Sequence, residues 1–231
     1  MKKMMCSLFL LMVCTWTYAQ KWETGVTAGF STFAMKDLKS DLERSIQDLP
    51  FEARIMTEFP SWFSFGGYLR CGLGIYSLGF EYDYNSTASR ISTSDYSGSY
   101  HFDELLSGHA FGMVNAFRIL RLGHFDAELS LNIGYLYTSM KTEEYLEALG
   151  TVIEFDNSYY SDSYYIKPGL IVSYSWRFLK FGADFGYLWD KKGEIKSDSV
   201  TLIKPYTTDW TGFRAEIRVG VCLDELLPKK K

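Results

Sequence analysis

The feature that most restricts how this chain can fold is a two-residue alternation of apolar and polar side chains. In Phe125–Thr138, every second residue from Phe125 to Tyr137 is apolar or aromatic, and most residues between them are polar or small. Successive side chains of a β-strand point to opposite faces, so this pattern predicts a strand with one apolar face. The same alternation predicts eight strands, over residues 22–33, 62–70, 76–84, 106–120, 125–138, 166–178, 181–189 and 213–223.

The segments between these strands differ systematically in length. Three are tight turns, near residues 71, 122 and 179. The other four are long, and they cover residues 34–60, 85–105, 139–163 and 191–209. Short turns at one rim and long loops at the other are typical of barrels in the bacterial outer membrane. The pattern therefore predicts an all-β fold: an eight-stranded antiparallel up-and-down transmembrane β-barrel with short periplasmic turns and long extracellular loops.

The alternation alone does not say which face of the strands points outward. A soluble ligand-binding barrel of the lipocalin type would have its apolar face inside, whereas a membrane barrel has it outside. The aromatic residues favour the membrane barrel, because they gather at the predicted strand ends, where amphipathic rings meet lipid headgroups. The predicted aromatic girdles contain Trp22, Trp62, Tyr82, Tyr135, Tyr137, Trp176, Tyr187, Trp189 and Trp210.

The polar face of the predicted strands combines glycine and serine with charged residues of both signs. The interior of an eight-stranded barrel is just wide enough for side chains to fill it. Charges in so narrow a space must pair, because an isolated buried charge is very costly. A salt-bridged plug is therefore expected, and a selective ion path is the alternative. The predicted lumen network consists of Glu23, Glu81, Asp83, Asp126, Glu128, Lys167, Arg177, Asp184, Arg214, Glu216 and Arg218.

The first 19 residues have the pattern of a secretory signal. Lys2 and Lys3 precede an apolar run that is too short to span a membrane as a helix, and small residues end the segment at Ala19. The alternatives are a buried N-terminal helix and a lipoprotein signal at Cys14, although bulky Val13 precedes that cysteine. The predicted organisation is a cleavable signal peptide over 1–19, a barrel domain over 20–223 and a short charged periplasmic tail over 224–231.

Three segments carry a resemblance to a known family. The signal that ends at Ala19-Gln20, the strand Thr24–Phe30 and the hairpin Leu69–Tyr84 resemble those of the small outer-membrane β-barrel, or porin-like, proteins of Gram-negative bacteria. Such chains usually end on an aromatic residue, whereas this one continues through Asp224–Lys231. The resemblance implies a location in the cell outer membrane. The partners that it implies are outer-membrane lipids, lipopolysaccharide, the barrel-insertion machinery and envelope or extracellular proteins.

Two of the long segments contain patterns of their own. In the first, Leu38, Leu42, Ile46 and Leu49 fall on one face of a helix. This predicts a short amphipathic helix that packs on the barrel rim, and a contact surface or lid is the alternative. The segment 139–163 clusters acidic residues that could bind a hard cation, but it has no ligand spacing. No metal and no cofactor is therefore predicted.

The sequence says less about activity than about architecture. A net charge of −4 lacks the basic footprint of a nucleic-acid-binding protein, so no nucleic-acid partner is expected. His109 follows Ser107 closely, but catalysis needs a base within reach of the hydroxyl and a group that orients the base, and nothing in the pattern argues for both. The chain is predicted not to be an enzyme. The expected function is a structural or interaction barrel with a plugged, charged lumen that displays surface loops. A narrow pore or transport-associated barrel is the first alternative, and an outer-membrane lipid-modifying enzyme is the second.

Overall fold

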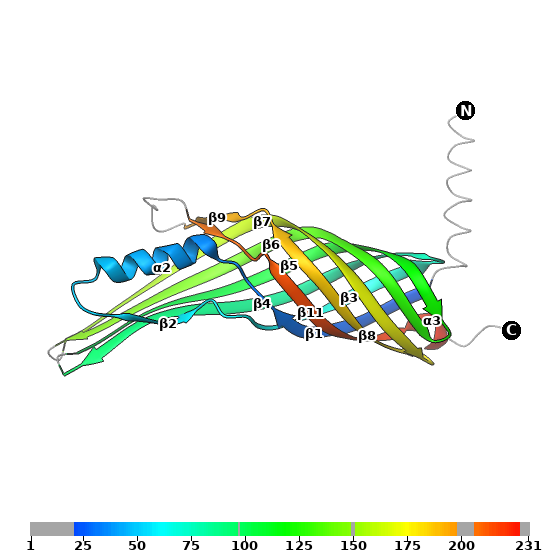
Figure 1. Ribbon diagram of the computed structural model, residues 1–231, viewed down its shortest axis with the longest axis horizontal. Coiled ribbons are helices and arrows are strands. Elements are labelled where there is room, and N and C mark those ends of the chain that lie inside the picture. The colour runs from blue at the N-terminus through cyan, green and yellow to red at the C-terminus, as the bar shows by residue number, and fades with distance from the viewer. Residues whose placement is uncertain (1–20, 97, 149–150, 198–205, 227–231) are drawn as a thin grey trace, which may run out of the picture.

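The computed structural model describes residues 21–96, 98–148, 151–197 and 206–226. Most of them belong to strands that run diagonally around a tube, whose long axis is horizontal in Figure 1. The elements in chain order are β1 (Lys21–Ser31), α2 (Lys36–Asp48), β2 (Arg54–Glu58), β3 (Trp62–Leu73), β4 (Tyr76–Asp95), β5 (Gly98–Leu122), β6 (Phe125–Ala148), β7 (Thr151–Trp176), β8 (Leu179–Asp190), β9 (Gly193–Lys196), β10 (Thr207–Thr208), β11 (Gly212–Cys222) and α3 (Leu223–Leu226).

Eight of these strands close into a ring. Each pairs antiparallel with the next in the order β1, β3, β4, β5, β6, β7, β8 and β11, and β11 pairs back onto β1. Gly25 of β1, for instance, lies between Tyr68 of β3 and Gly220 of β11. A closed ring has no free strand edge, so its backbone groups are paired as a lipid environment requires. The predicted eight-stranded antiparallel barrel is confirmed.

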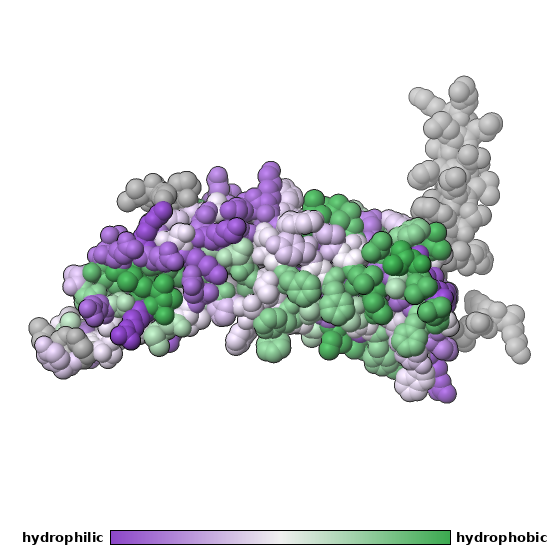
Figure 2. Space-filling view, in the orientation of Figure 1, coloured by the Kyte–Doolittle hydropathy of each residue, from purple (hydrophilic) through white to green (hydrophobic). Residues whose placement is uncertain are grey.

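The apolar face of the ring points outward. Leu131 and Val172 are 39% and 40% exposed, whereas Asn132, which follows Leu131, is only 1% exposed. Hydrophobic side chains cover the barrel half of the molecule, and hydrophilic ones gather over the half that carries α2 (Figure 2). The orientation is that of a membrane barrel, and the lipocalin alternative, with its apolar face inside, is wrong.

Small residues make room inside the ring. A Cβ atom on Gly112 would lie 1.9 Å from Asn132 Oδ1 and 2.3 Å from the hydroxyl oxygen of Tyr165. These distances are far below van der Waals contact, so only glycine fits at this position. Glycine on the inward face therefore lets large side chains from other strands cross the lumen.

Four strands continue far beyond the length needed to cross a membrane. β5, β6 and β7 have 25, 24 and 26 residues, and β4 has 20, whereas a tilted spanning strand needs about 9–11. The expectation that 85–105 and 139–163 are loops is therefore wrong. The alternation of buried and exposed side chains continues there, since Thr87, Ser89 and Ile91 are all buried. Because most of the inward-facing residues are small and polar, a hydropathy pattern does not reveal this alternation.

The strand extensions form an open, curved sheet that α2 covers. β2 pairs with β4 at one side of this sheet, β9 pairs with β7 at the other, and β10 pairs with β9. The predicted amphipathic helix is confirmed over Lys36–Asp48, and it buries Leu38 and Leu42 on the sheet. The helix and the sheet enclose an apolar core that lies beyond the charged lumen. Its buried members are Phe33, Met35, Leu38, Leu42, Phe59, Ile91, Tyr100, Leu106, Ala110, Leu136, Met140, Tyr165, Leu188, Ile195 and Trp210.

The two predicted terminal segments lie mostly outside the residues that the structure describes. The signal peptide over 1–19 falls entirely on residues that the structure does not describe. The tail over 224–231 is described only where α3 begins it. No helix in the described part of the chain is long and apolar enough to cross a membrane.

Candidate functional site

The charged residues inside the barrel form the candidate site. The structure places all but one of the predicted lumen residues on the inward face of the ring. Glu23 is half-buried there. The others are buried, and they are Glu81, Asp83, Asp126, Glu128, Lys167, Asp184, Arg214, Glu216 and Arg218.

Arg177 is the exception, and its assignment to the lumen is wrong. In the sequence the alternation of β7 continues through Arg177, but the strand ends at Trp176, which pairs with Leu179. Arg177 lies in the tight turn between these residues, with a φ of 53°, and its side chain is exposed. A turn that reverses the chain breaks the two-residue period, so the strand pattern no longer determines where the side chain points.

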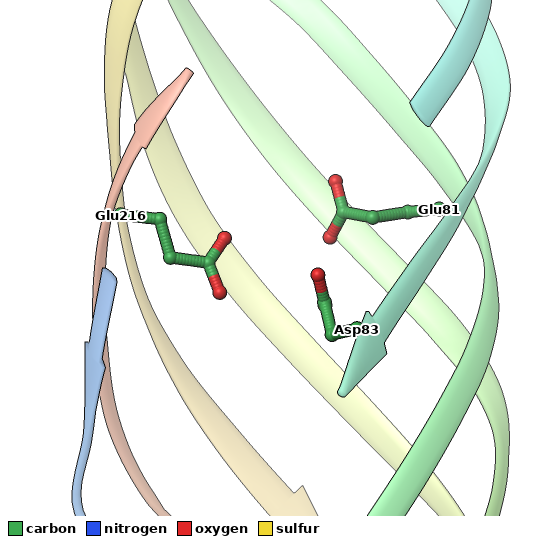
Figure 3. A group of neighbouring side chains, drawn as sticks. All are labelled: Glu81, Asp83 and Glu216. Carbon is green, nitrogen blue, oxygen red and sulfur yellow. The ribbon is translucent and has the colours of Figure 1, made fainter. Parts of the chain in front are cut away.

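Three carboxylates from two distant strands meet at the centre of the lumen. Glu81 and Asp83 of β4 and Glu216 of β11 point toward one another in Figure 3, and each offers an oxygen within 4.8 Å of the others. The ammonium of Lys167 on β7 lies among them, with Nζ 2.6 Å from Glu81, 3.3 Å from Asp83 and 3.8 Å from Glu216. Carboxylates in this arrangement could hold a cation, but Lys167 supplies the positive charge itself.

Arg218 extends this cluster to the opposite wall. Its guanidinium lies 3.2 Å from the second carboxylate oxygen of Glu81 and 2.9 Å from Asp184 of β8. It also stacks over the ring of Tyr68, 4.1 Å from the ring centroid. The guanidinium therefore joins β4, β8 and β3 across the barrel.

A second cluster fills the end of the lumen near the short turns. Arg70 of β3 forms an ion pair with Glu128 of β6. Lys180 of β8 lies 2.8 Å from Glu23 of β1, which also accepts a hydrogen bond of 2.7 Å from the Tyr68 hydroxyl. The cavity between these side chains is about 10 Å³, which is barely enough for one water molecule. The interior at this level is filled by side chains.

Arg70 and Lys180 were absent from the predicted network, although the sequence carried their signal. Arg70 follows Leu69, which points to lipid, and Lys180 precedes Phe181, which does the same. Strict alternation therefore places both side chains inside. Arg70 was missed because the alternation of the strand around it is less regular, and Lys180 was missed because it lies beside a turn.

Trp210 is buried toward the other end of the lumen, and its assignment to an aromatic girdle is wrong. It is fully buried, and its indole nitrogen donates a hydrogen bond of 2.8 Å to Thr138 Oγ1. Its ring packs where a Cβ on Gly108 would lie, 2.8 Å from Trp210 Cζ2. Arg214 anchors the same residue by donating to the Trp210 carbonyl at 2.8 Å. Trp210 precedes β11 and lies outside the alternating run, so the strand pattern could not assign its face.

The other predicted girdle residues lie on the outer wall. Trp22 and Trp176 are exposed near the short turns. At the opposite rim, Tyr82 is half-buried, and Trp62, Tyr135, Tyr137, Tyr187 and Trp189 are exposed. These positions are consistent with two aromatic bands around the barrel.

Ser107 and His109 do not form a catalytic pair in the structure. Both lie on the outer wall, where the Tyr82 hydroxyl is 2.9 Å from His109 Nδ1 and the Tyr84 hydroxyl is 3.1 Å from Ser107 Oγ. Each side chain is therefore held by a different tyrosine. Nucleophilic catalysis would need the histidine within reach of the serine hydroxyl.

Comparison with known proteins gives similarities of structure alone. No family model matches the chain, and no curated protein matches it. Two solved structures of Ail, the attachment invasion locus protein of Yersinia pestis, are similar to it. The first is 12% identical, has a TM-score of 0.35, and covers 87% of this chain and 97% of that chain. The second, in complex with the heparin analogue sucrose octasulfate, is 11% identical, has a TM-score of 0.37, and covers 87% and 98%.

Neisserial surface protein A (NspA) is similar to a comparable degree. It is 13% identical, has a TM-score of 0.33, and covers 87% of this chain and 94% of that chain. Identities and TM-scores this low transfer no property from these proteins.

Proposed function

We propose that this chain is an outer-membrane β-barrel that is closed to solutes and that holds a β-sheet outside the cell, where the sheet binds protein partners. The observation that carries this proposal is the continuation of β4–β7 beyond the apolar wall of the ring. A strand that only anchors a protein in a membrane has no need of 25 residues.

The outer wall supports a location in the outer membrane. Its exposed residues within the ring are mainly apolar, and aromatic side chains lie toward both ends. A soluble protein rarely exposes so large an apolar surface. Lipids would contact this wall, and lipopolysaccharide would meet the aromatic band at the rim that carries the extensions. The barrel-insertion machinery remains an expected partner.

The packing of the lumen argues against the alternative of a pore. Ion pairs cross it at two levels, around Lys167 and around Lys180, and Trp210 fills it toward the extensions. Eight-stranded barrels have little room for water in any case, whereas open channels have about 16–18 strands. We therefore assign the charged network a structural role in sealing and fixing the barrel.

Contacts on both faces make the extracellular sheet rigid. Its concave face buries an apolar core against α2, and its convex face carries ion pairs such as the one between Arg90 and Asp103, at 2.5 Å. Antiparallel pairing continues to the ends of both hairpins, through Gly98 of β5 and Ala148 of β6. A sheet supported on both faces can present a binding surface at low entropic cost.

One edge of this sheet offers a way to bind. β7 pairs with β6 along Thr151–Asn157, and no strand in the described ranges pairs with the other side of this segment. Val152, Ile153 and Phe155 are exposed along it. An exposed apolar edge strand is a template for adding an extended peptide by main-chain hydrogen bonds. The partner that fits is an extended segment of an envelope or extracellular protein.

Peptide display against the barrel in lipid nanodiscs would test this proposal. We expect enriched peptides to bind wild type and to lose binding to the double variant Ile153→Lys/Phe155→Lys, because edge lysines block strand addition. Ser139→Lys is the matched control, since Ser139 is exposed on β6, which is paired on both sides. Equal binding to wild type and to the double variant would contradict the assignment of the β7 edge.

A further inference from the structure

An acidic side chain lies buried in the apolar layer beneath α2. Glu104 belongs to the part of β5 that extends beyond the ring, and it is only 3% exposed. Ile91 and Leu106, which point to the same side of the sheet, are at most 1% exposed. Within the described part of the chain, Glu104 accepts a side-chain hydrogen bond from Ser89 Oγ at 2.8 Å. A single neutral donor offsets little of the desolvation cost of a buried, ionised carboxylate.

The helix brings a second acid toward this carboxyl. α2 buries Leu38 and Leu42 on the sheet, and the half-buried Asp41 between them faces Glu104. Like charges across a closed interface repel, and the repulsion is stronger where water is excluded. The contact between helix and sheet therefore disfavours an ionised Glu104.

The remaining groups on the helix side do not supply a compensating charge. Tyr206 donates a hydrogen bond to Asp41 and carries no positive charge. Arg44 is exposed and lies near Tyr206. Among the described residues, no basic side chain forms an ion pair with Glu104.

The sheet side offers no compensation either. The ion pair between Arg90 and Asp103 lies on the convex face, away from α2. Glu144 of β6 adds another acid to the concave face, where it accepts a hydrogen bond from Tyr100. Burial, followed by the charge of Asp41, raises the pKa of Glu104 to about 7.

We propose that α2 is a pH-responsive cover over the extracellular end of the barrel, held closed while Glu104 is protonated and loosened when Glu104 ionises. The closed form binds this proton more tightly than an open form, in which the exposed carboxyl would have its ordinary pKa of 4.5. The closed form is therefore most stable below pH 4.5, and its stability relative to the open form falls as the pH rises toward about 7. The lumen salt bridges lie deeper than α2, so loosening the cover exposes the concave face of the sheet rather than a channel.

Hydrogen exchange of the α2 amides in the full-length protein in nanodiscs tests this inference. Glu104→Gln keeps the shape of the protonated side chain and removes the titration. At pH 8, α2 should exchange on the order of 100-fold faster in wild type than in Glu104→Gln, and at pH 5 the two should agree within about fivefold. Comparing variants at equal pH cancels the intrinsic exchange rate. A Glu43→Gln control on the exposed side of α2 should behave as wild type.

Two outcomes would overturn the proposal. One is an equal rate of α2 exchange in wild type and Glu104→Gln at pH 8. If Glu104→Gln does not fold, Asp41→Asn decides, because removing the facing charge should slow α2 exchange at pH 8 and leave it unchanged at pH 5. Exchange in Asp41→Asn that matches wild type at both values is the second contradicting outcome. The test requires no partner, so it is independent of whether the β7 edge binds peptides.

Discussion

At the scale of single residues, Lys167 is the cation shared by the three carboxylates at the centre of the lumen. Its ammonium is within 4 Å of three carboxylates that come from opposite walls of the barrel. A buried ion pair often adds little net stability compared with an apolar pair, but removing one partner leaves the other charges buried without compensation. Lys167 therefore stabilises the closed ring mainly by making the burial of Glu81, Asp83 and Glu216 tolerable.

Replacing this one ammonium should be costly. We expect Lys167→Met to lower the free energy of unfolding by about 3–5 kcal/mol at pH 8, because three carboxylates lose their shared cation. Urea titration of the lipid-embedded protein would measure the loss. Lys141→Met is the control, since Lys141 is exposed on the convex face and should matter little. A Lys167→Met barrel as stable as wild type would show that the carboxylates do not depend on it.

At the scale of elements, the sequence predicted the strands better than their ends. The alternation located the eight ring strands and their faces because lipid on one side and a packed lumen on the other select opposite residue types. The alternation fails as a guide beyond the membrane, where lipid and a packed lumen no longer select opposite residue types. Beyond the membrane, residues such as Thr87 and Ser89 can face an interior as well as water, so strand and loop have similar composition. Arg177 was misplaced because it lies in a tight turn, and Trp210 because it precedes β11 and lies outside the alternating run.

The strands also depend on glycine at positions that face a crowded lumen. Gly112→Val should prevent closure, because the added carbon atoms would overlap Asn132 and the Tyr165 hydroxyl, and neither can move within the filled interior. Migration of unheated protein on gels would report the loss of the folded band. Gly72→Ala is the control, because its added Cβ would lie 3.5 Å from the nearest neighbour, an ordinary van der Waals contact. Normal folding of Gly112→Val would mean that the lumen is less tightly packed than described.

At the scale of the whole molecule, two cores are stacked along one axis. The ring has its apolar residues outside and its charges inside, and the extension has an apolar core beneath α2. This reversal places the first in lipid and the second in water. Trp210 and Arg214 lie at the junction, where the polar lumen ends and the apolar core begins. On the proposed function, the molecule is an anchor joined to a display surface, with a sealed interior between them.

If the interior is sealed, the barrel should conduct no ions across a membrane. Wild-type protein inserted in planar lipid bilayers should give no resolved conductance steps, because side chains fill the lumen near Lys180 and at Trp210. Insertion must be established in the same membranes by protection from protease. Stable, ohmic conductance from correctly inserted wild-type protein would favour the narrow pore instead.

The strand extensions are expected to lie outside the cell, and the short turns in the periplasm. Cysteine labelling on intact cells tests this orientation most directly, in a background where Cys71 and Cys222 are replaced by serine. Ser94 is exposed near the tip of the β4–β5 hairpin, and Ile75 is exposed in the short turn between β3 and β4. We predict that an impermeant thiol reagent labels Ser94→Cys on whole cells and labels Ile75→Cys only after the outer membrane is opened. Labelling of Ile75→Cys but not of Ser94→Cys on intact cells would contradict the account.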